Sequence, residues 1–218
     1  MPTDQQIKSK QRATDHGEVF TNPREVNAML DLVKHETERI DSRFLEPACG
    51  TGNFLIEVLR RKSVVIQERY RQSQIEYERY TVLAVGSIYG IDLLADNVTE
   101  CRARLFNEVA ATYRQRFRSK AKEQFLETIN YILTRNIQIG DALTLQTPDN
   151  NKPIIFSEWT LVRGSQFKRR DYTMANLLAS QPINAPNLFS DLGDRAFIPK
   201  PIADYPLTHL LKLPHVQN

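Results

Sequence analysis

Apolar residues recur along the chain in two patterns. In one, they stand three or four positions apart, which is typical of the buried face of an amphipathic helix. In the other, they form short uninterrupted runs, which are typical of strands buried on both faces. Helices that alternate with such strands predict an α/β fold with a parallel sheet. The helical pattern covers residues 23–33, 53–81, 95–117 and 119–134, and the apolar runs cover residues 42–47, 87–94 and 136–141.

Two further segments follow the third apolar run. Residues 152–162 predict a fourth strand of the same sheet, and Arg163-Gly164 can turn it into a β-hairpin with residues 165–174. Six of the eleven prolines lie beyond residue 180, among apolar residues that favour packing over a free linker. The chain is therefore expected to consist of a mobile polar arm (1–15), a domain (16–178) and an extended Pro-rich C-terminal arm packed on it (179–218).

The composition narrows the class of protein without identifying a ligand. The chain has 218 residues, of which 41% are hydrophobic and 25% are charged, as in soluble globular proteins. A net charge of +3 neither requires nor excludes a nucleic-acid partner. Two cysteines favour a reducing cytoplasm, and four scattered histidines show no metal-ligand spacing. The N-terminus is polar and no apolar run is long enough to span a bilayer, so we expect a cytoplasmic protein without membrane contact or metal.

The stretch EPACGTGNFLIE, residues 46–57, places two glycines between a predicted strand and a predicted helix. Such a turn brings free backbone amides and the positive end of the helix dipole to one place. Gly50 and Gly52 also let a ligand approach the backbone, because no Cβ stands in the way. The turn therefore predicts a small-molecule site at the carboxyl end of the first strand.

Acidic residues end the next two strands, with Asp92 after the second and Asp141 after the third. Because the carboxyl ends of neighbouring parallel strands meet at one edge of a sheet, these carboxylates and the glycine turn should line one crevice. Asp92 is placed to hold two ribose hydroxyls, and Asp141 to accept a hydrogen bond from an exocyclic amine. The turn has no third glycine and no following Gly-Lys-Ser/Thr, so we expect a nucleoside-like ligand without a pyrophosphate.

Four segments together resemble a known family. EPACGTGNFLIE resembles motif I of the adenine-specific DNA methyltransferases of restriction-modification systems, which use S-adenosylmethionine. GEVFTNPREVNAMLDLV resembles their motif X, YGIDLLADNVTECRARL their motif II, and NIQIGDAL their motif III. The four matches follow the order of the family and cover roughly residues 17–145. The resemblance implies a Rossmann-like class I methyltransferase fold, here with a truncated sheet.

The resemblance also implies which residues contact the cofactor, S-adenosylmethionine. The segment at residues 20–21 would border its methionine and adenine parts, and the glycine turn would shape the methionine pocket. Asp92 would hold the ribose, and Asp141 would face the adenine amine. The implied cofactor-binding residues are Phe20, Thr21, Glu46, Pro47, Ala48, Gly50, Gly52, Asp92, Leu93, Asp141 and Ala142, with Ile91 as a further apolar wall.

One motif of the family is missing. Its members carry (Asn/Asp)-Pro-Pro-(Tyr/Phe) after the fourth strand, where it holds the flipped base, whereas this chain contains no Pro-Pro. Ser157, Glu158 and Trp159 stand in that place and are the candidate catalytic residues. Trp159 would stack on the base, and Glu158 or Ser157 would accept a hydrogen bond from its amine. Core packing for Trp159 and an ordinary exposed position for Glu158 are the alternative readings.

The hairpin also carries a cluster of basic residues. These side chains can hold DNA phosphates, or they can protect a solvated edge strand against pairing with other chains. The candidate nucleic-acid contacts are Arg163, Lys168, Arg169 and Arg170.

The sequence therefore leads to two main hypotheses. The first is an S-adenosylmethionine-dependent, adenine-specific DNA methyltransferase of restriction-modification type, with a possible partner subunit for target recognition. The second is a non-catalytic subunit that binds the cofactor or a partner protein in a modification, restriction or anti-phage assembly. A third reading keeps the enzyme and changes its substrate to protein or RNA.

Overall fold

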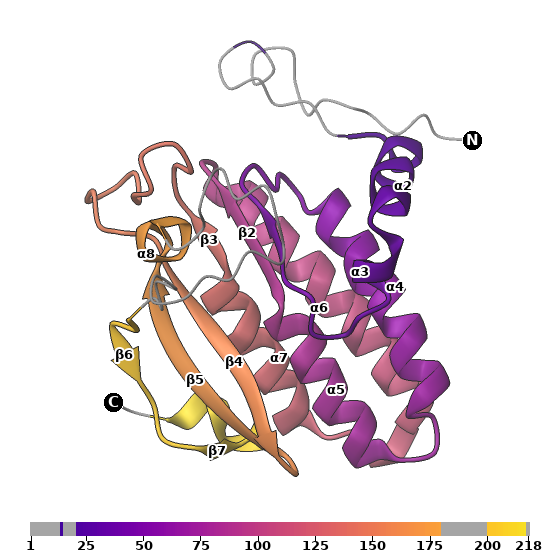
Figure 1. The fold of residues 1–218 in the computed structure, drawn as a ribbon. Coiled ribbons are helices and arrows are strands. Elements are labelled where there is room, and N and C mark those ends of the chain that lie inside the picture. The colour runs from indigo at the N-terminus through magenta and orange to yellow at the C-terminus, as the bar shows by residue number, and fades with distance from the viewer. Residues whose placement is uncertain (1–13, 15–20, 180–199, 217–218) are drawn as a thin grey trace, which may run out of the picture.

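A parallel sheet of three short strands organises the fold (Figure 1). The computed structural model describes residues 14, 21–179 and 200–216. Both strand pairings in this sheet are parallel, and the order β1-β2-β3 makes the second strand central. The predicted α/β class with a parallel sheet is therefore confirmed. The three strands are β1 (Phe44–Glu46), β2 (Ile88–Asp92) and β3 (Ile137–Ile139).

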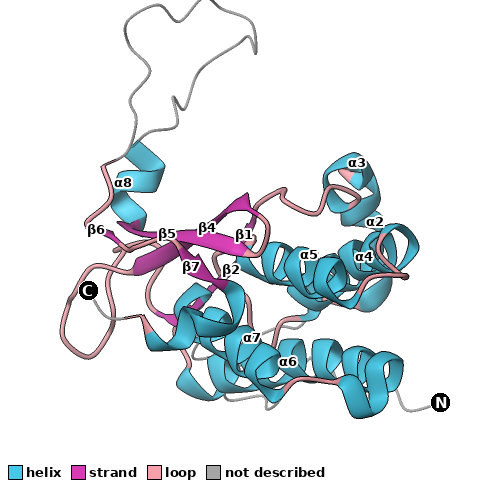
Figure 2. Cartoon of the chain, turned by 90° about the horizontal axis from the view of Figure 1, so that it is seen from below, coloured by secondary structure: helices cyan, strands magenta, loops and turns pink. Residues whose placement is uncertain are grey.

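Each connection between neighbouring strands of this sheet contains two α-helices, and the second also contains the 3₁₀ helix η1 (Arg118–Lys120). Figure 2 shows the four α-helices gathered on one side of the strands. Gly90 in β2 lets them pack closely, because a Cβ there would lie 2.9 Å from the Leu55 side chain. Two further helices, α2 (Pro23–Leu32) and α3 (Lys34–Thr37), precede the sheet. The connecting helices are α4 (Asn53–Arg69), α5 (Gln74–Gly86), α6 (Ala95–Phe117) and α7 (Glu123–Asn136).

The helical stretch expected over residues 53–81 is two helices, not one. The first helix ends at Arg69, and the second begins after Ser73, whose side chain accepts a hydrogen bond from the Glu76 amide at 3.3 Å. Serine followed three residues later by glutamate is the sequence signature of a capping box. The helical spacing of apolar residues continues across the break, and this is why periodicity alone did not reveal it.

The predicted hairpin forms a second sheet. Strand β4 (Ile155–Arg163) pairs antiparallel with β5 (Gln166–Thr173), and β5 also pairs with β6 (Ala203–Asp204) and β7 (Thr208–His209). In the described residues, β4 has no pairing with any strand of the parallel sheet. The prediction of a fourth strand in that sheet is therefore wrong.

Strand β4 lies across the face of the parallel sheet and runs in the opposite direction to β2. At its start, Ile154 contacts Gly140, which follows the carboxyl end of β3. Further along, Trp159 contacts Gly86, which precedes the amino end of β2. The strand therefore leads away from the carboxyl edge of the sheet. An apolar cluster joins the hairpin to β2 and consists of Tyr89, Ile91, Ile154, Phe156 and Met174.

Residues 200–216 return to the hairpin and to α7. They contribute β6, β7 and the 3₁₀ helix η2 (Leu210–His215), and Leu210 and Leu213 are buried against the core. The Thr128 hydroxyl in α7 donates a hydrogen bond of 2.8 Å to the Leu210 carbonyl. A short helix, α8 (Met174–Ala179), follows β5. Apart from Thr14, the expected arm over residues 1–15 lies outside the described residues, as do residues 180–199 of the C-terminal arm.

The described helices include none that is both long enough and apolar enough to cross a membrane. The longest, α6, carries charged residues along its whole length. It therefore belongs to the covering layer of the sheet, where its apolar stripe is buried.

Lys62 is a buried cation that ties α4 to the ends of the sheet. Its side chain is fully buried, and its ammonium donates to the carbonyls of Ile40 and Ser42 and to the Ser87 hydroxyl. Burial lowers the pKa of Lys62 from its usual value to about 7. The folded protein therefore releases this proton near neutrality, whereas an unfolded chain keeps it until about pH 10.

We predict that this lysine makes the protein more stable as the pH rises from 7 to 8.5. Over that range the unfolded state binds more protons than the folded state, so the free energy of unfolding should increase by up to about 2 kcal/mol. Urea denaturation at a series of pH values measures the slope. The Lys62→Met variant should lose this slope, although its three orphaned acceptors lower its stability. Equal slopes for parent and variant would contradict the assignment.

Candidate functional site

A cleft of about 500 Å³ lies where the three parallel strands end. Segments that follow β1, β2 and β3 form three of its walls. Thr21, just before α2, and Met29, within α2, form the fourth, the N-terminal wall. The lining residues are Thr21, Met29, Glu46, Pro47, Ala48, Cys49, Gly50, Asn53, Phe54, Asp92, Leu93, Leu94, Asn97, Gly140, Asp141, Ala142 and Leu143.

The glycine turn after β1 is held by backbone hydrogen bonds. The Cys49 amide donates to the Ile91 carbonyl in β2, and the Gly52 amide donates to the Cys49 carbonyl, both at 2.8 Å. Gly50 and Gly52 have φ angles of 51° and 89°, in the left-handed region that favours glycine. Gly52 is the N-cap of α4 and has no side chain to cap the helix, so the turn leads directly into the first helical amides.

Asp92 joins this turn to the start of α6. One carboxylate oxygen accepts from the Gly50 amide at 2.9 Å. The other oxygen accepts from the Leu94 amide at 2.9 Å and from the Asn97 side chain at 3.2 Å. A carboxylate has about four acceptor positions, so these three bonds leave room for a further donor from the cleft. Asp92 thus combines a structural role in the turn with a free acceptor position at the site.

The other two acids of the cleft differ in their surroundings. Hydrogen bonds from the Leu143 amide and from Thr144 hold the pKa of Asp141 below its usual value, so its carboxylate is ionised at neutral pH. Burial raises the pKa of Glu46, and a hydrogen bond from the Ala48 amide partly offsets this rise. A cation bound beside Glu46 would favour its ionised form.

All the charged residues in the described lining of the cleft are acidic. Its described lining contains the carboxylates of Glu46, Asp92 and Asp141 and no lysine, arginine or histidine. Carboxylates that converge on one concave site create a negative potential there, which attracts cations and repels phosphates. The cleft therefore favours a cationic ligand over a nucleotide polyphosphate.

Apolar side chains form the rim of the cleft. Leu143 is 94% exposed, Met29 53% and Leu93 51%, although all three line the same hollow. Exposed apolar groups around a polar floor suit a ligand with a flat, weakly polar ring. Ile91, expected as another wall, instead faces the hairpin and is fully buried there, because neighbouring residues of a strand point to opposite faces.

A stripe on α6 supports the floor of the cleft from behind, and sequence analysis did not single it out. Asn97, Cys101 and Arg104 are spaced four and three residues apart, so they share one face of the helix. Asn97 bonds Asp92, Cys101 packs against Gly52, and Arg104 bonds the turn. The helical spacing of these three residues after Asp92 was visible in the sequence, but only the contacts in the structure show that they support the cleft.

The two cysteines are buried together under the turn. A hydrogen bond with Cys101 and burial both raise the pKa of Cys49. A thiol that resists deprotonation is a poor nucleophile. Cys49 is therefore a packing residue of the cleft floor.

The structure brings most of the predicted cofactor residues to this one cleft. Gly52 lies behind the turn against α6 instead of facing the hollow, and Phe20 lies outside the described residues. The predicted residues that line the cleft are Thr21, Glu46, Pro47, Ala48, Gly50, Asp92, Leu93, Asp141 and Ala142.

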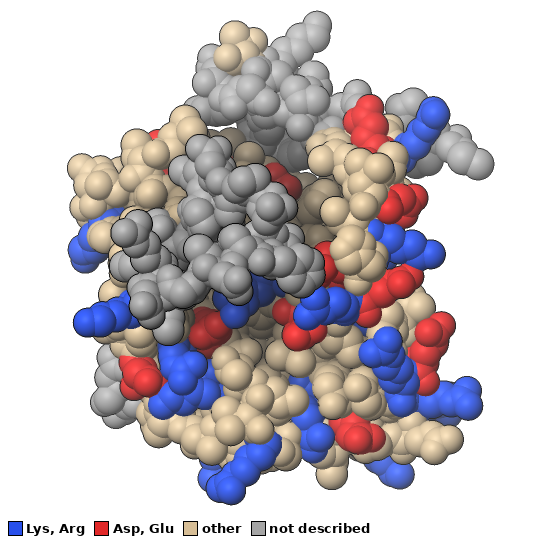
Figure 3. All heavy atoms as spheres, in the orientation of Figure 1, with Lys and Arg blue, Asp and Glu red and all other residues tan. Residues whose placement is uncertain are grey.

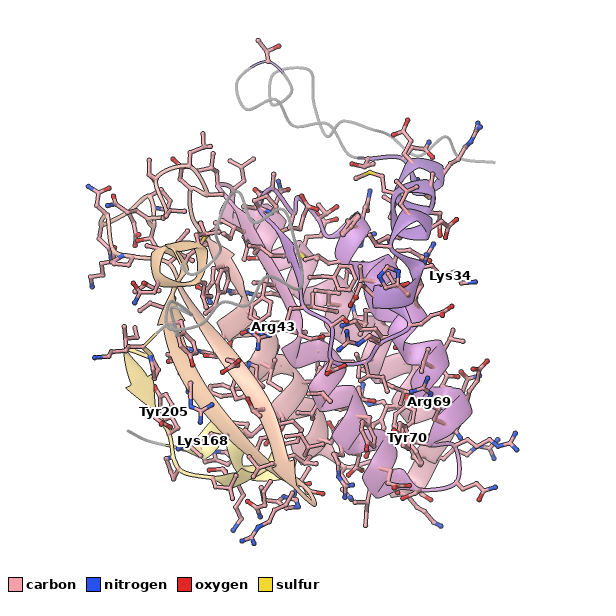
Figure 4. All side chains as sticks on the ribbon, viewed as in Figure 1. Lys34, Arg43, Arg69, Tyr70, Lys168 and Tyr205 are labelled. Atoms are coloured by element: carbon pink, nitrogen blue, oxygen red, sulfur yellow. The ribbon has the colours of Figure 1, made fainter. Side chains whose placement is uncertain are left out.

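The candidate catalytic residues lie elsewhere. Ser157 and Trp159 are buried, and none of the three candidates lines the cleft, because β4 leads away from its edge. The Ser157 hydroxyl donates to Asp171 at 2.6 Å, and the Trp159 indole packs over Gly86. Glu158 pairs at 2.6 Å with Arg43, which is labelled in Figure 4. The expected contacts of Ser157 and Trp159 with a substrate base are therefore corrected to structural roles, whereas the role of Glu158 stays a prediction.

The basic residues of the hairpin are mostly neutralised by acids. Arg169 is buried and pairs with Asp171 at 2.6 Å, so its expected contact with DNA phosphate is corrected to a buried ion pair. Lys168 pairs with Asp204 at 2.5 Å, and Arg170 lies within 4 Å of both Asp204 and Glu158. Figure 3 shows acidic and basic side chains interspersed on this side of the molecule. Arg163 remains exposed at the end of β4.

We predict that the Gly52→Ala substitution destabilises the protein through a clash with α6. A Cβ at this position would lie 2.6 Å from the Cys101 sulfur, in addition to straining a backbone with positive φ. Gly164→Ala is the control, since its φ is also positive and its Cβ would meet open space. We expect a loss of about 1 kcal/mol at Gly164 and at least about 1 kcal/mol more at Gly52, measured by urea denaturation.

A second substitution checks the origin of this difference. In the Gly52→Ala/Cys101→Ala double variant the clash is removed, so the two costs should be less than additive. Strict additivity would show that Cys101 does not limit the space at the turn.

Comparison of the chain with family models, with curated proteins and with solved structures found no match. The functional assignment therefore depends on the chemistry of the cleft and on the motifs of the sequence.

Proposed function

We propose that the chain binds S-adenosylmethionine in this cleft and is a Rossmann-like methyltransferase that transfers the methyl group to DNA, at the exocyclic amine of adenine. The observation that carries the cofactor proposal is the charge of the cleft. Three carboxylates converge at the ends of three parallel strands, and no described lining residue carries a positive charge. S-adenosylmethionine bears a sulfonium and an ammonium cation and one carboxylate, so its net charge is positive, and it also contains a ribose and an adenine.

The groups of the cleft match the parts of this cofactor. Asp92 has an acceptor position for the ribose hydroxyls, and Asp141 presents an ionised carboxylate for the adenine amine. Glu46 ends β1 just before the glycine turn and would compensate the ammonium or sulfonium charge. The apolar rim around Leu93 and Leu143 would cover the adenine ring.

For methyl transfer, the protein mainly has to position the cofactor and the substrate amine. The cofactor, held by Glu46, Asp92 and Asp141, would supply an electrophilic methyl group to the substrate amine. The methyl group is already activated by the sulfonium, so catalysis consists mainly of alignment and charge stabilisation. The product carries no sulfonium charge, which reduces its attraction to an acidic cleft and favours its release.

The choice of DNA adenine as substrate is supported by the resemblance of the motifs alone. A specific observation favours a second candidate, a non-catalytic subunit that binds the cofactor. Ser157 and Trp159, which stand where the family holds the base, are buried in the hairpin. Under this candidate, a partner subunit would provide the groups that hold the base and recognise the target.

We predict that the purified protein binds S-adenosylmethionine and discriminates against ATP. Calorimetric titration should show binding of the first ligand and no comparable binding of the second, since phosphates would face three carboxylates. Asp92→Asn should weaken binding about tenfold or more, because a charged acceptor becomes neutral. Asp149→Asn, on an exposed loop, is the matched control and should bind like the parent. A folded parent that binds neither ligand would contradict the proposal.

A separate measurement distinguishes the two candidate functions. Unmethylated DNA is incubated with the protein and a cofactor labelled on its methyl group, and the nucleosides are then analysed. Label in methylated adenine is the expected result for the enzyme, and it should be lost in Asp92→Asn. Binding of the cofactor without incorporation of label would identify the non-catalytic subunit.

A further inference from the structure

A chain of hydrogen bonds runs from α6 through the glycine turn to the N-terminal wall of the cleft. One terminal nitrogen of Arg104 lies 2.7 Å from the Thr51 carbonyl and 2.9 Å from the Thr51 hydroxyl. The same nitrogen lies 2.9 Å from Oδ1 of Asn53. The side-chain nitrogen of Asn53 then donates to the Thr21 carbonyl at 3.2 Å.

The polarity of this chain fixes the orientation of the Asn53 amide. A guanidinium can only donate, so the asparagine oxygen must face Arg104 and its NH₂ group must face away. That NH₂ group meets a backbone carbonyl, which can only accept. Arg104 therefore determines that Asn53 presents a donor to Thr21.

Thr21 and Met29 form the N-terminal wall of the cleft. The later turns of α2 have their own anchors, since Val26 and Leu30 are buried and Arg61 bonds Asp31 at 2.8 Å. The start of this wall, before the first buried residue of α2, meets the turn through Asn53. Loss of this bond should therefore loosen the start of α2 and leave the rest of the helix in place.

We infer that Arg104 and Asn53 are positioning residues that hold the N-terminal wall of the cleft over the glycine turn. They act through Thr21 and Thr51; Asn53 also lines the cleft, whereas Arg104 does not. The consequence for ligand affinity rests on the proposed function, whereas the attachment of Thr21 to the turn does not. Their role is to keep the width of the cleft constant while the ligand enters and leaves.

Asn53→Asp tests the inference because it changes only the hydrogen bond to Thr21 and keeps the one to Arg104. The carboxylate keeps an acceptor for Arg104 and loses the donor to Thr21, where two oxygens would now face each other. Asn53 is the first residue of α4, and an acid there is favourable for the helix dipole. The variant should therefore be at least as stable as the parent in urea. Asn107→Asp, an exposed position on α6, is the control for the added charge.

The first readout is hydrogen exchange of the free protein. We expect about threefold to tenfold faster exchange of the amides at the start of α2 in Asn53→Asp, the range for loss of one hydrogen bond, with no change in α7. Arg104→Met should give the same result and should also speed exchange in the turn at residues 50–53. Arg114→Met, at an exposed ion pair on the same helix, is its control. Unchanged exchange at the start of α2 in both variants would overturn the inference.

The second readout is the affinity for S-adenosylmethionine measured by calorimetry. If the wall contributes to binding, Arg104→Met, which changes no residue of the lining, should bind about threefold to tenfold more weakly. A parent that does not bind, together with altered exchange in the variants, would reject the proposed function and keep the attachment of the wall. A parent that binds, together with variants that match it in exchange and affinity, would reject the positioning role alone.

Discussion

The shape of the cleft depends on the hydrogen bonds that the Asp92 carboxylate accepts. Two segments meet at this carboxylate: the glycine turn through the Gly50 amide, and the start of α6 through the Leu94 amide and the Asn97 side chain. Without this acceptor, two backbone amides near the end of the sheet would lose their partner, which is costly wherever water cannot replace it. The residue that would hold the ribose is thus also the residue that gives the cleft its shape.

The cleft was predictable from the sequence because its chemistry is local. Each of Glu46, Asp92 and Asp141 stands directly after an apolar run, and parallel strands bring such positions together whatever the details of packing. The supporting contacts were not predictable in this way. Arg104 is more than fifty residues from Thr51, and its helical spacing from Asn97 and Cys101 does not reveal which residue it contacts.

The hairpin shows the opposite case, in which a correct local prediction gave a wrong functional one. The strands and the turn at Gly164 form as expected, but the direction of β4 depends on contacts of Ile154 with Gly140 and of Trp159 with Gly86. Those contacts decide that Trp159 is a core residue. Similarly, the basic residues of the hairpin predict a phosphate site, but in the structure Asp204 of the C-terminal segment pairs with Lys168. The spacing of apolar residues and the runs of charged residues do not reveal contacts with residues that are distant in the sequence.

These two cases together show that the acidic cleft and the hairpin are separate parts of this fold. The cleft is built from β1–β3, α2, α4 and α6, whereas the hairpin covers the other face of the sheet and contributes no described residue to the lining. A change in the hairpin can therefore alter what is presented to a substrate without disturbing Asp92 or the glycine turn. Conversely, an intact acidic cleft is not an argument for catalysis, because nothing in its geometry requires a base nearby. Under the proposed function, binding of the cofactor would be necessary for transfer but not sufficient for it, so each has to be measured by itself.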